Sequence, residues 1–466
     1  MKQKKHKRFQ TVNQVKIEFT KKPITPWGGV ASVIAKFLEV IRFREWVERN
    51  IPIKETSNNG KGIYEKVIAQ FLTVLVGGFR FSHLSWWGNG IDILMRAFGL
   101  RWLPEASSTL TRFWNKISRQ GLAEKMGVSG RSFAKEVIKW ERLYEDTLNL
   151  DSTVLTRYGE QEGAKRGYNP KKPGRPSHHP LIAFLGSGYT VNVWNRVGSA
   201  SAGQSASDFF EQTRQMLGGD FRVKGVHCDS GFYLIEFIGY LEERGFYYII
   251  AVPMWEIFQR EIMKIKEWSE VAKGVEVAEF RFKHLDPKWK RERRYVVVRQ
   301  LVKARPKASG KQPGLFKEVE EWKEYRFTVM ITNDESSCPE EIWRQYRKRA
   351  NDENKVKDLK EGFGLASFNT DSFWATEAVM VMNVLVFHNL IHYLNRNILN
   401  VKGPVEHLRT LRSKYFIIPG VLGSCGGYAV LRLSVNNRKL KAKLKYFLEK
   451  ISLISHRLNC IAVGSG

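Results

Sequence analysis

One predicted helix, which begins near Pro339, constrains this 466-residue chain more than any other segment. Pro339 and the two acidic residues after it suit a first helical turn, and no further Pro or Gly occurs until Gly362. With about 100° per residue, four side chains fall within roughly 60° of one another. They are Tyr346, Arg349, Glu353 and Lys360. A carboxylate, two cations and an aromatic ring therefore share one stripe, unless this is only a solvated face with i,i+4 ion pairs.

Two acidic residues upstream follow strand-like stretches. Asp151 lies near the end of the apolar segment 143–155, and Asp229 directly follows Val223–Cys228. Alone, each Asp-Ser pair is more typical of a turn or a helix cap. Together with the spacing Tyr-x2-Arg-x3-Glu-x6-Lys, however, they resemble the YREK signature of bacterial insertion-sequence DDE transposases. The resemblance extends from about Asp151 to Lys360. Among these transposases, the chain resembles the superfamily numbered four, and we suggest its thirteen-eighty branch.

The resemblance implies a fold and a chemistry. The fold is an α/β ribonuclease-H-like catalytic core interrupted by a β-rich insertion, with a helical N-terminal domain and a helical C-terminal region. Asp151, Asp229 and Glu353 would bind two Mg²⁺ ions, for which Mn²⁺ substitutes, and the enzyme would catalyse cut-and-paste transposition, with a hairpin intermediate as one route. The partners would be double-stranded DNA with terminal inverted repeats and target DNA, bound by a homodimer. Phosphates would be held by Arg349 and Lys360, braced by Tyr346, with Lys357 added because it lies one turn after Glu353.

Composition agrees with a polyanionic partner. The chain has 76 Lys and Arg against 47 Asp and Glu, a formal net charge of +29. A hydrophobic content of 43% excludes wholesale disorder. Its cysteines form no CxxC pair, which argues against a zinc ribbon or a disulfide framework, and they are Cys228, Cys338, Cys425 and Cys460. We expect a cytoplasmic bacterial protein, nucleoid-associated when bound to DNA, and we interpret the apolar segment Ala375–Leu394 as a buried core helix rather than a membrane span.

The sequence divides into five parts by composition and predicted secondary structure. They are a basic disordered arm (1–30), a helical DNA-binding domain (31–142), the catalytic core (143–253 and 339–400), the β-rich insertion (254–338) and a C-terminal region with a possible dimerisation role (401–466). The C-terminal region is expected to contain a glycine-rich turn, Gly420–Gly427. After it comes a basic amphipathic helix, Asn437–His456, which could face DNA, dimerise or pack on its own core.

Three further segments are candidates for DNA contact. Helices Ile91–Phe98 and Ser107–Ile117 could form a helix-turn-helix that presents Arg112 and Lys116, although any helical domain contains such pairs. The basic loop 164–177 could grip phosphates, or it could be an ordinary solvated loop. Its cations include Lys171, Lys172 and Arg175.

Tryptophans of the insertion are candidates to stack on a base flipped out at a hairpin. The insertion contains Trp255, Trp268, Trp289 and Trp322, and most tryptophans in such domains are core residues. Trp289 stands in a polar, basic context, so we expect it to be the least buried and choose it first.

Two other functions remain open at this level. The chain could be a catalytically silent DNA-binding protein derived from a transposase, or a two-metal DNA nuclease with the same core. The acidic triad argues against the first, and the large helical N-terminal domain and β-rich insertion argue against the second.

Overall fold

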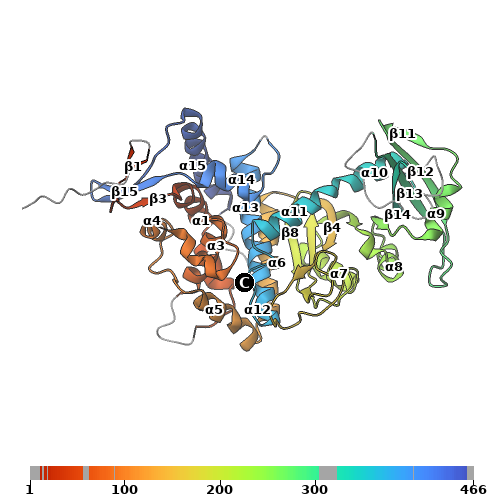
Figure 1. Cartoon of the computed structure of the whole chain (residues 1–466), viewed down its shortest axis with the longest axis horizontal. Helices are drawn as coiled ribbons and strands as arrows, with labels where there is room; N and C mark the ends of the chain where they lie inside the picture. The colour runs from red at the N-terminus through yellow and green to blue at the C-terminus, as the bar shows by residue number, and fades with distance from the viewer. Residues whose placement is uncertain are drawn as a thin grey trace, which may run out of the picture.

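The computed structural model describes residues 11–12, 15–17, 19–55, 62–88, 90–303, 323–401 and 403–458. The molecule is elongated, with the N- and C-terminal parts at one end, a mixed sheet with helices in the middle and the insertion at the other end (Figure 1). Three features singled out in the sequence lie outside the described residues, namely the first ten residues of the basic arm, Trp322 and Cys460.

A nine-stranded sheet organises the centre and the insertion, in the order β11-β12-β13-β14-β10-β9-β4-β7-β8. Its central strands are β4 (Glu145–Ser152), β7 (Leu181–Leu185), β8 (Thr190–Trp194), β9 (Arg222–Cys228) and β10 (Tyr248–Val252). The first three pair antiparallel, whereas β9 runs parallel to β4 and β10 parallel to β9. Since β7 is buried along its whole length, apolar side chains cover both faces of the sheet there.

The insertion continues this same sheet. Its strands are β11 (Ser269–Ala272), β12 (Val275–Phe282), β13 (Arg293–Leu301) and β14 (Tyr325–Thr332). Strand β14 pairs antiparallel with β10, so the last strand of the insertion returns the chain to the central sheet. Helix α9 (Glu256–Met263) belongs to the insertion, and α7 (Ala206–Leu217) and α8 (Ile235–Glu243) to the central region.

Two helices follow β14 where the sequence predicted one. Helix α10 (Pro339–Lys348) and helix α11 (Ala350–Glu361) meet at Arg349. The backbone tightens there, because Asp352 N–H donates to Arg349 C=O at 2.7 Å, a bond to the third preceding residue. The angular spacing of the side chains in the expected stripe therefore changes at its centre.

The N-terminal region is helical, as expected. It contains a π-helical turn η1 (Val30–Ile34), α1 (Ala35–Val40), α2 (Phe43–Asn50), α3 (Ile63–Leu75), a 3₁₀ segment η2 (Phe81–Trp87), α4 (Ile91–Ala97), α5 (Ser107–Arg119) and α6 (Ala123–Trp140). Helices α1 and α2 are separated at Arg42, whose φ is +55°. The helix-turn-helix interpretation is wrong: α4 and α5 are joined by a nine-residue stretch, 98–106, and α5 packs mainly against a core helix, α12 (Phe373–Val381).

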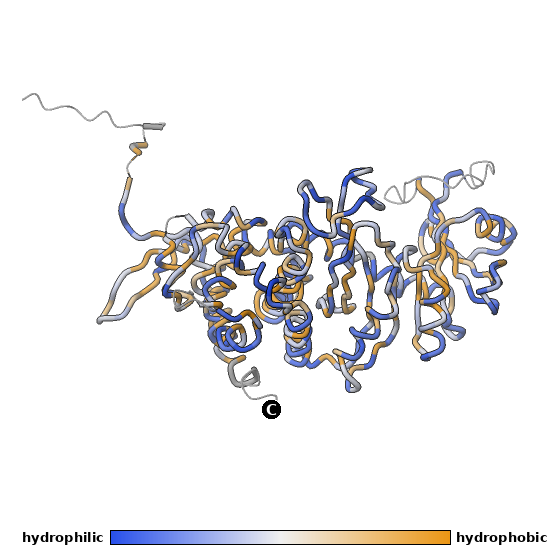
Figure 2. The backbone as a smooth tube through the Cα atoms, turned by 90° about the horizontal axis from the view of Figure 1, so that it is seen from below, coloured by the Kyte–Doolittle hydropathy of each residue, from blue (hydrophilic) through white to orange (hydrophobic). Residues whose placement is uncertain are grey.

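A long apolar helical segment, Phe373–Leu399, runs through the middle of the molecule. It consists of α12 (Phe373–Val381), η7 (Met382–Phe387), α13 (His388–Leu394) and η8 (Asn395–Leu399). By length and composition this one helix among the described residues could cross a membrane, but 89% of its apolar window is buried inside the protein. Helix α6 approaches it closely at Gly130, where an added Cβ would lie 2.2 Å from Val381 Cγ1. Apolar residues are concentrated in these central helices and strands (Figure 2).

A buried polar chain ties the N-terminal helices to this central segment. Trp114 Nε1 donates to Gln70 Oε1 at 2.6 Å, and Gln70 Nε2 donates to Asn383 Oδ1 at 2.7 Å. Asn383 Nδ2 in turn donates to Phe363 C=O at 2.9 Å, just beyond the end of α11. Because each buried donor has a partner, the network fixes the position of the N-terminal helices relative to α11.

The C-terminal region folds back onto the N-terminal region. It contains α14 (Leu408–Leu411), η9 (Arg412–Phe416), β15 (Gly420–Cys425), β16 (Tyr428–Leu433) and α15 (Arg438–Leu458). The expected turn Gly420–Gly427 is instead mostly strand β15. Two short strands, β1 (Thr11–Val12) and β2 (Val15–Lys16), pair near the N-terminus, and β3 (Ile24–Thr25) pairs with β15. The boundary of the disordered arm at residue 30 is therefore wrong, since β3 pairs with β15, Trp27 bridges to Ile418, and Gly28 N–H donates to Ile418 C=O at 2.8 Å.

Candidate active site

The site lies where two neighbouring parallel strands end. Leu150 of β4 stands opposite Cys228 of β9, so the next residues, Asp151 and Asp229, emerge side by side. Two carboxylates at adjacent carboxyl ends of parallel strands face the same edge of the sheet. The structure thus brings together two of the three acids singled out in the sequence.

Asp151 is held in a largely dry environment. Its side chain is 15% exposed, and its Oδ1 accepts a hydrogen bond from Ser152 N–H at 2.8 Å. Burial raises the pKa of this carboxyl to about 7, the Arg349 guanidinium opposes the rise, and Asp229 and Asp352 add to it. Arg349 Nη2 stands 3.5 Å from Asp151 Oδ1 and is its counter-ion.

Asp229 begins a short turn. Its Oδ1 accepts from Gly231 N–H at 2.9 Å and so caps the 3₁₀ turn η3 (Ser230–Phe232). The backbone amides at Ser152 and Gly231 each engage one oxygen of the two acids, and the second oxygen of each acid is left for another ligand. This arrangement suits a hard cation, which prefers carboxylate oxygens.

Helices α10 and α11 lie across the ends of the two strands and contact the backbone beside each end. The Tyr346 hydroxyl donates to Cys228 C=O at 3.3 Å, next to Asp229, and Lys360 Nζ donates to Val154 C=O at 3.2 Å, beyond Asp151. Arg349 lies between these two anchors. Three of the four residues predicted to share the stripe therefore face the acids.

The fourth stripe residue, Glu353, is solvent-exposed, and the neighbouring Asp352 is buried instead, at 1% exposure. Asp352 Oδ1 accepts from Lys355 Nζ at 2.8 Å, and its Oδ2 is 4.0 Å from Arg349 Nε. The tightened turn at Arg349 accounts for this departure from the expected common stripe. Asp352 and Lys355 form an ion-pair chain with Arg349 that sequence reasoning missed, although the acid-x2-Lys spacing was visible.

A divalent cation fits this site in part. Asp151 and Asp229 provide converging oxygen donors, and Arg349 occupies the space a cation would compete for. Among the described residues no three His, Cys, Asp or Glu side chains gather closely enough to hold a metal, because Glu353 points to solvent. A side-chain rotation of Glu353 would be needed to complete a three-carboxylate set.

A cavity of about 580 Å³ opens beside the acids. It is lined by the turn after Asp229, the segment after β4, Lys360, and part of the predicted phosphate loop. Burial and the neighbouring Lys171 lower the pKa of Lys360 to about 8, whereas Asp151 opposes this. A buried amine facing a second cation gains stability from an anion, so this wall of the cavity suits a phosphate.

His179 lines the same cavity and was not singled out in the sequence. Its Nδ1 lies 2.8 Å from Ala200 C=O and its Nε2 lies 3.2 Å from Ser152 Oγ. The carbonyl can only accept, so Nδ1 carries the proton and Nε2 accepts from the serine. Burial lowers the pKa of His179, which keeps the ring neutral.

The predicted phosphate loop lies at the edge of the cavity, and Lys171 lines it. Lys172 and Arg175 are exposed nearby. Far from being an unsupported loop, the segment is folded around buried Asn169, whose Oδ1 accepts from Lys172 N–H at 3.2 Å and whose Nδ2 donates to Thr156 Oγ1 at 3.1 Å. Lys357 is exposed on α11 and does not line the cavity.

Arg112 and Lys116, the two cations expected on a recognition helix, differ in whether they are free to contact DNA. Arg112 is exposed on α5, but Lys116 Nζ is paired with Glu55 at 2.5 Å. The structure does not place either residue near the two acids.

The expectation that Trp289 is exposed is wrong. It is 6% exposed and stacks between Tyr233 and His284, at centroid distances of 4.9 and 5.2 Å, with the Arg293 guanidinium 5.1 Å from its ring centroid. These partners come from other segments, which the local polar context could not reveal. Trp268 is partly buried, whereas Trp255 is 49% exposed and meets Tyr233 edge-on at 5.7 Å.

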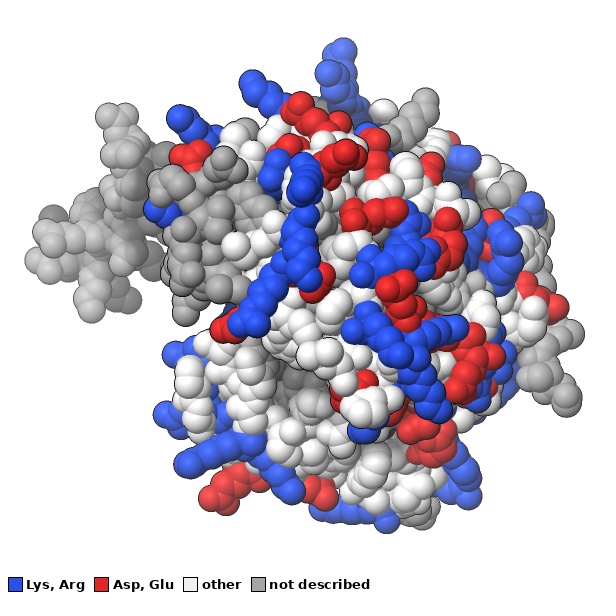
Figure 3. Space-filling model, turned by 90° about the vertical axis from the view of Figure 1, so that its right-hand side faces the viewer, with Lys and Arg blue, Asp and Glu red and all other residues white. Residues whose placement is uncertain are grey.

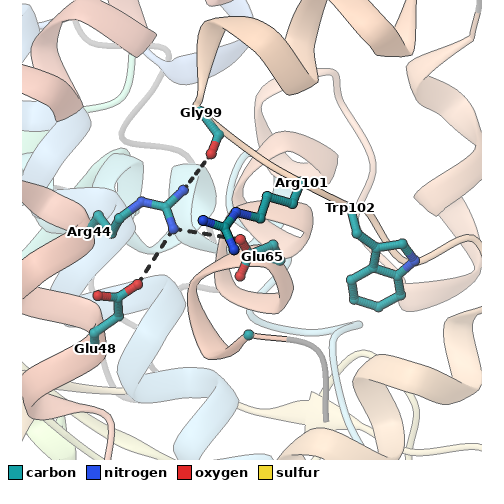
Figure 4. A pocket seen from close by; sticks show the side chains of 7 residues that line it. Arg44, Glu48, Glu65, Gly99, Arg101 and Trp102 are labelled. Atoms are coloured by element: carbon teal, nitrogen blue, oxygen red, sulfur yellow. Dashed lines mark hydrogen bonds and ion pairs between the residues drawn. The ribbon is translucent and has the colours of Figure 1, made fainter. Parts of the chain in front are cut away.

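A second cavity, of about 720 Å³, lies in the N-terminal helical region (Figure 4). Arg44 points into it but donates to Gly99 C=O at 2.6 Å and pairs with Glu48 and Glu65 at 3.5 and 3.6 Å. Its charge is already balanced, and the cavity does not adjoin Asp151 or Asp229. We therefore place the chemistry at the smaller cavity.

The comparisons with known proteins bear on this site. No curated protein matches the chain. Among solved structures, it is similar to the piggyBac transposase in a synaptic complex with hairpin DNA, with 11% identity, a TM-score of 0.39 and coverage of 95% of this chain and 86% of that one. Residues 101–455 match the family model of the transposase DDE domain, group 1. Because that match spans more than half of the chain, the protein belongs to this family of DDE transposases.

Proposed function

We propose that the chain is a cut-and-paste DNA transposase of the insertion-sequence type that carries the YREK signature. The observation that supports this most strongly is the placement of Asp151 and Asp229 side by side. Arg349 pairs with Asp151, and Tyr346 and Lys360 bind backbone carbonyls close to the two acids. The strand order β8-β7-β4-β9-β10, antiparallel on one side of β4 and parallel on the other, further supports a ribonuclease-H-like core.

In this proposal Asp151, Asp229 and Glu353 hold two Mg²⁺ ions, for which Mn²⁺ substitutes. Bound divalent ions in such sites activate the attacking hydroxyl and stabilise the leaving oxygen of a phosphodiester. The family of DDE transposases implies dependence on divalent metal. Glu353 joins the set by turning its exposed side chain toward Asp151.

The cations of the site have separate tasks. Arg349 neutralises Asp151 and fixes the direction of its carboxylate, while Asp352 and Lys355 keep Arg349 in place. Lys360 and Lys171 face one another across the cavity wall and hold a phosphate of the scissile strand. Tyr346, bound to the backbone beside Asp229, keeps α10 in register with β9.

A hairpin intermediate, if formed, needs an aromatic surface for the flipped base. Trp255 replaces Trp289 as the candidate, because it is exposed and its partner Tyr233 directly follows the turn that Asp229 caps. We further propose a homodimer on DNA, with one active site for each inverted-repeat end, in the cytoplasm of a bacterium.

The test compares strand cleavage and DNA affinity in the same variants. With a fragment that contains the ends of the element and Mg²⁺, Asp229→Ala and Glu353→Ala should lose cleavage while DNA binding persists, since binding depends on the basic surface. Glu361→Ala, an exposed acid on the same helix, is the matched control and should retain cleavage.

The outcomes separate the alternatives. Wild-type protein that binds ends without cutting them points to a catalytically silent DNA-binding protein. Cleavage without joining to target DNA points to a nuclease. Normal cleavage by Glu353→Ala removes that residue from the metal site and leaves Asp352 as the acid to test next.

A further inference from the structure

Helix α15 carries a row of cations whose charge is not balanced within the protein. Five of its lysines are exposed, and none is in an ion pair with a carboxylate in the part of the chain that the structure describes. They are Lys439, Lys441, Lys443, Lys445 and Lys450. The helix lies toward the end of the molecule opposite the insertion, apart from α10 and α11 (Figure 1).

The local energetics of α15 disfavour this arrangement. The first four residues of the helix, Arg438–Lys441, include three cations and no acid, although the N-terminus of a helix is the positive end of its dipole. Lys439 and Lys443, and likewise Lys441 and Lys445, are like-charge pairs four residues apart, which each destabilise a helix by about 0.2–0.5 kcal/mol. A polyanion would relieve both effects.

In the insertion, several arginines are matched with acids. Arg294 is paired with Glu279, and Arg299 is paired with Glu276 at 2.7 Å. On the face of the molecule at that end, Lys and Arg side chains are interspersed with Asp and Glu side chains (Figure 3). The unbalanced charge of α15 is therefore not simply what a net charge of +29 produces everywhere.

The apolar face of α15 is already occupied. Leu444, Phe447 and Ile451 are at most 4% exposed and belong to the main hydrophobic core, and the helix packs on α1, η1 and η8. A helix that lies on a membrane needs its apolar face free to enter the lipid. The solvent-facing flanks offer cations, together with Tyr446, which is 42% exposed beneath Lys450.

We propose that α15 is a second DNA-binding surface, which holds the sugar-phosphate backbone of duplex DNA away from the catalytic cavity. This inference rests on the proposed function in taking DNA as the substrate. From Lys439 to Lys450 the helix rises by about 16 Å, and duplex DNA carries one phosphate charge per about 1.7 Å of axis. Several phosphates thus lie within reach of the lysines, and the contact reads no sequence.

The test is the salt dependence of binding to a duplex of about 40 base pairs of arbitrary sequence. The variant Lys439→Gln/Lys441→Gln/Lys443→Gln/Lys445→Gln should bind more weakly, and the slope of log K against log salt should fall by about 0.9 for each lost phosphate contact. Its thermal stability should be unchanged or higher, because like-charge repulsion is removed.

A control variant removes the same charge from lysines that are already ion-paired. It is Lys139→Gln/Lys224→Gln/Lys264→Gln/Lys288→Gln. The four lysines pair with Glu136, Glu145, Glu261 and Glu236 at 2.9, 2.6, 2.7 and 3.4 Å. Equal slopes for the two variants would overturn the proposal, as would lysine-dependent binding of anionic lipid vesicles with unchanged DNA affinity. Failure of the wild type to bind or cut DNA would instead contradict the proposed function itself.

Discussion

Asp151→Asn should stabilise the metal-free protein, and the gain should grow with pH. Asparagine mimics the protonated carboxyl and cannot ionise. The pKa of Asp151 is raised from 3.8 to about 7, chiefly by burial, so the folded state keeps the proton longer than the unfolded state does. As the pH rises from 3.8, the pKa of the unfolded state, toward 7, ionisation of Asp151 lowers the stability of the wild type. The variant has no group that ionises there, so it keeps its stability.

The magnitude follows from the shift of roughly three units at about 1.4 kcal/mol each. The advantage of Asp151→Asn should be close to zero near pH 4, about 2 kcal/mol near pH 5 and about 4 kcal/mol near pH 7, with no further growth above that. The Asp151 side chain is only 15% exposed, so little of this is lost to solvent screening. Residual structure in the unfolded state would reduce it.

The assay is thermal or denaturant unfolding in EDTA across this pH range, with Asp220→Asn, an exposed acid, as the control. Mg²⁺ should shrink the advantage of the variant, because an ion bound by the wild type stabilises it by about 2.7 kcal/mol at a hundred times its dissociation constant. Equal stabilities of wild type and Asp151→Asn at every pH in EDTA would mean that Arg349 or water fully compensates the carboxylate, and the reasoning would be wrong.

Two further predictions rest on burial. Asp352→Ala should destabilise the protein by about 3–5 kcal/mol, since it leaves Lys355 without its buried ion-pair partner and Arg349 with Asp151 alone, whereas Glu353→Ala should change stability by less than about 0.5 kcal/mol while abolishing cleavage. Comparable unfolding curves for the two variants would contradict the placement of these side chains. Trp289→Ala should cost about 3–5 kcal/mol as a core deletion, and Trp255→Ala should leave stability nearly intact but lose hairpin ends on a denaturing gel. Normal hairpins from Trp255→Ala would show that the flipped base stacks elsewhere.

Local patterns were sufficient for the strands. Val223–Cys228 was predicted and forms strand β9, Arg222–Cys228, and the strands Leu181–Leu185, Val275–Phe282 and Tyr325–Thr332 show the same kind of pattern. Their β-branched and apolar residues fit a sheet, and turn-forming residues mark their ends. The two strand-end acids could be found the same way, because Asp151 lies near the end of one recognisable strand and Asp229 directly follows another.

Contacts between distant segments could not be predicted. Residues 24–30 appeared to belong to a disordered arm because their partner strand, β15, lies near the other end of the chain. Trp289 appeared exposed because its neighbours in sequence are charged, yet Tyr233 and His284 enclose it. The break at Arg349 left no sign in the helical pattern, and it decides which acid, Asp352 or Glu353, is buried.

The insertion is joined by direct contacts to the edge of the sheet that carries Asp229. Strand β14 continues the sheet from β10, and the Tyr233 hydroxyl meets that of Tyr295 of β13 at 2.9 Å. Tyr233 also stacks on buried Trp289 and supports exposed Trp255. Because Tyr233 directly follows the turn that Asp229 caps, the position of Trp255 is fixed relative to the acid through a few rigid contacts. If Trp255 stacks on a flipped base, as proposed above, then buried Trp289 has a positioning role, because it holds Tyr233, the residue that Trp255 contacts.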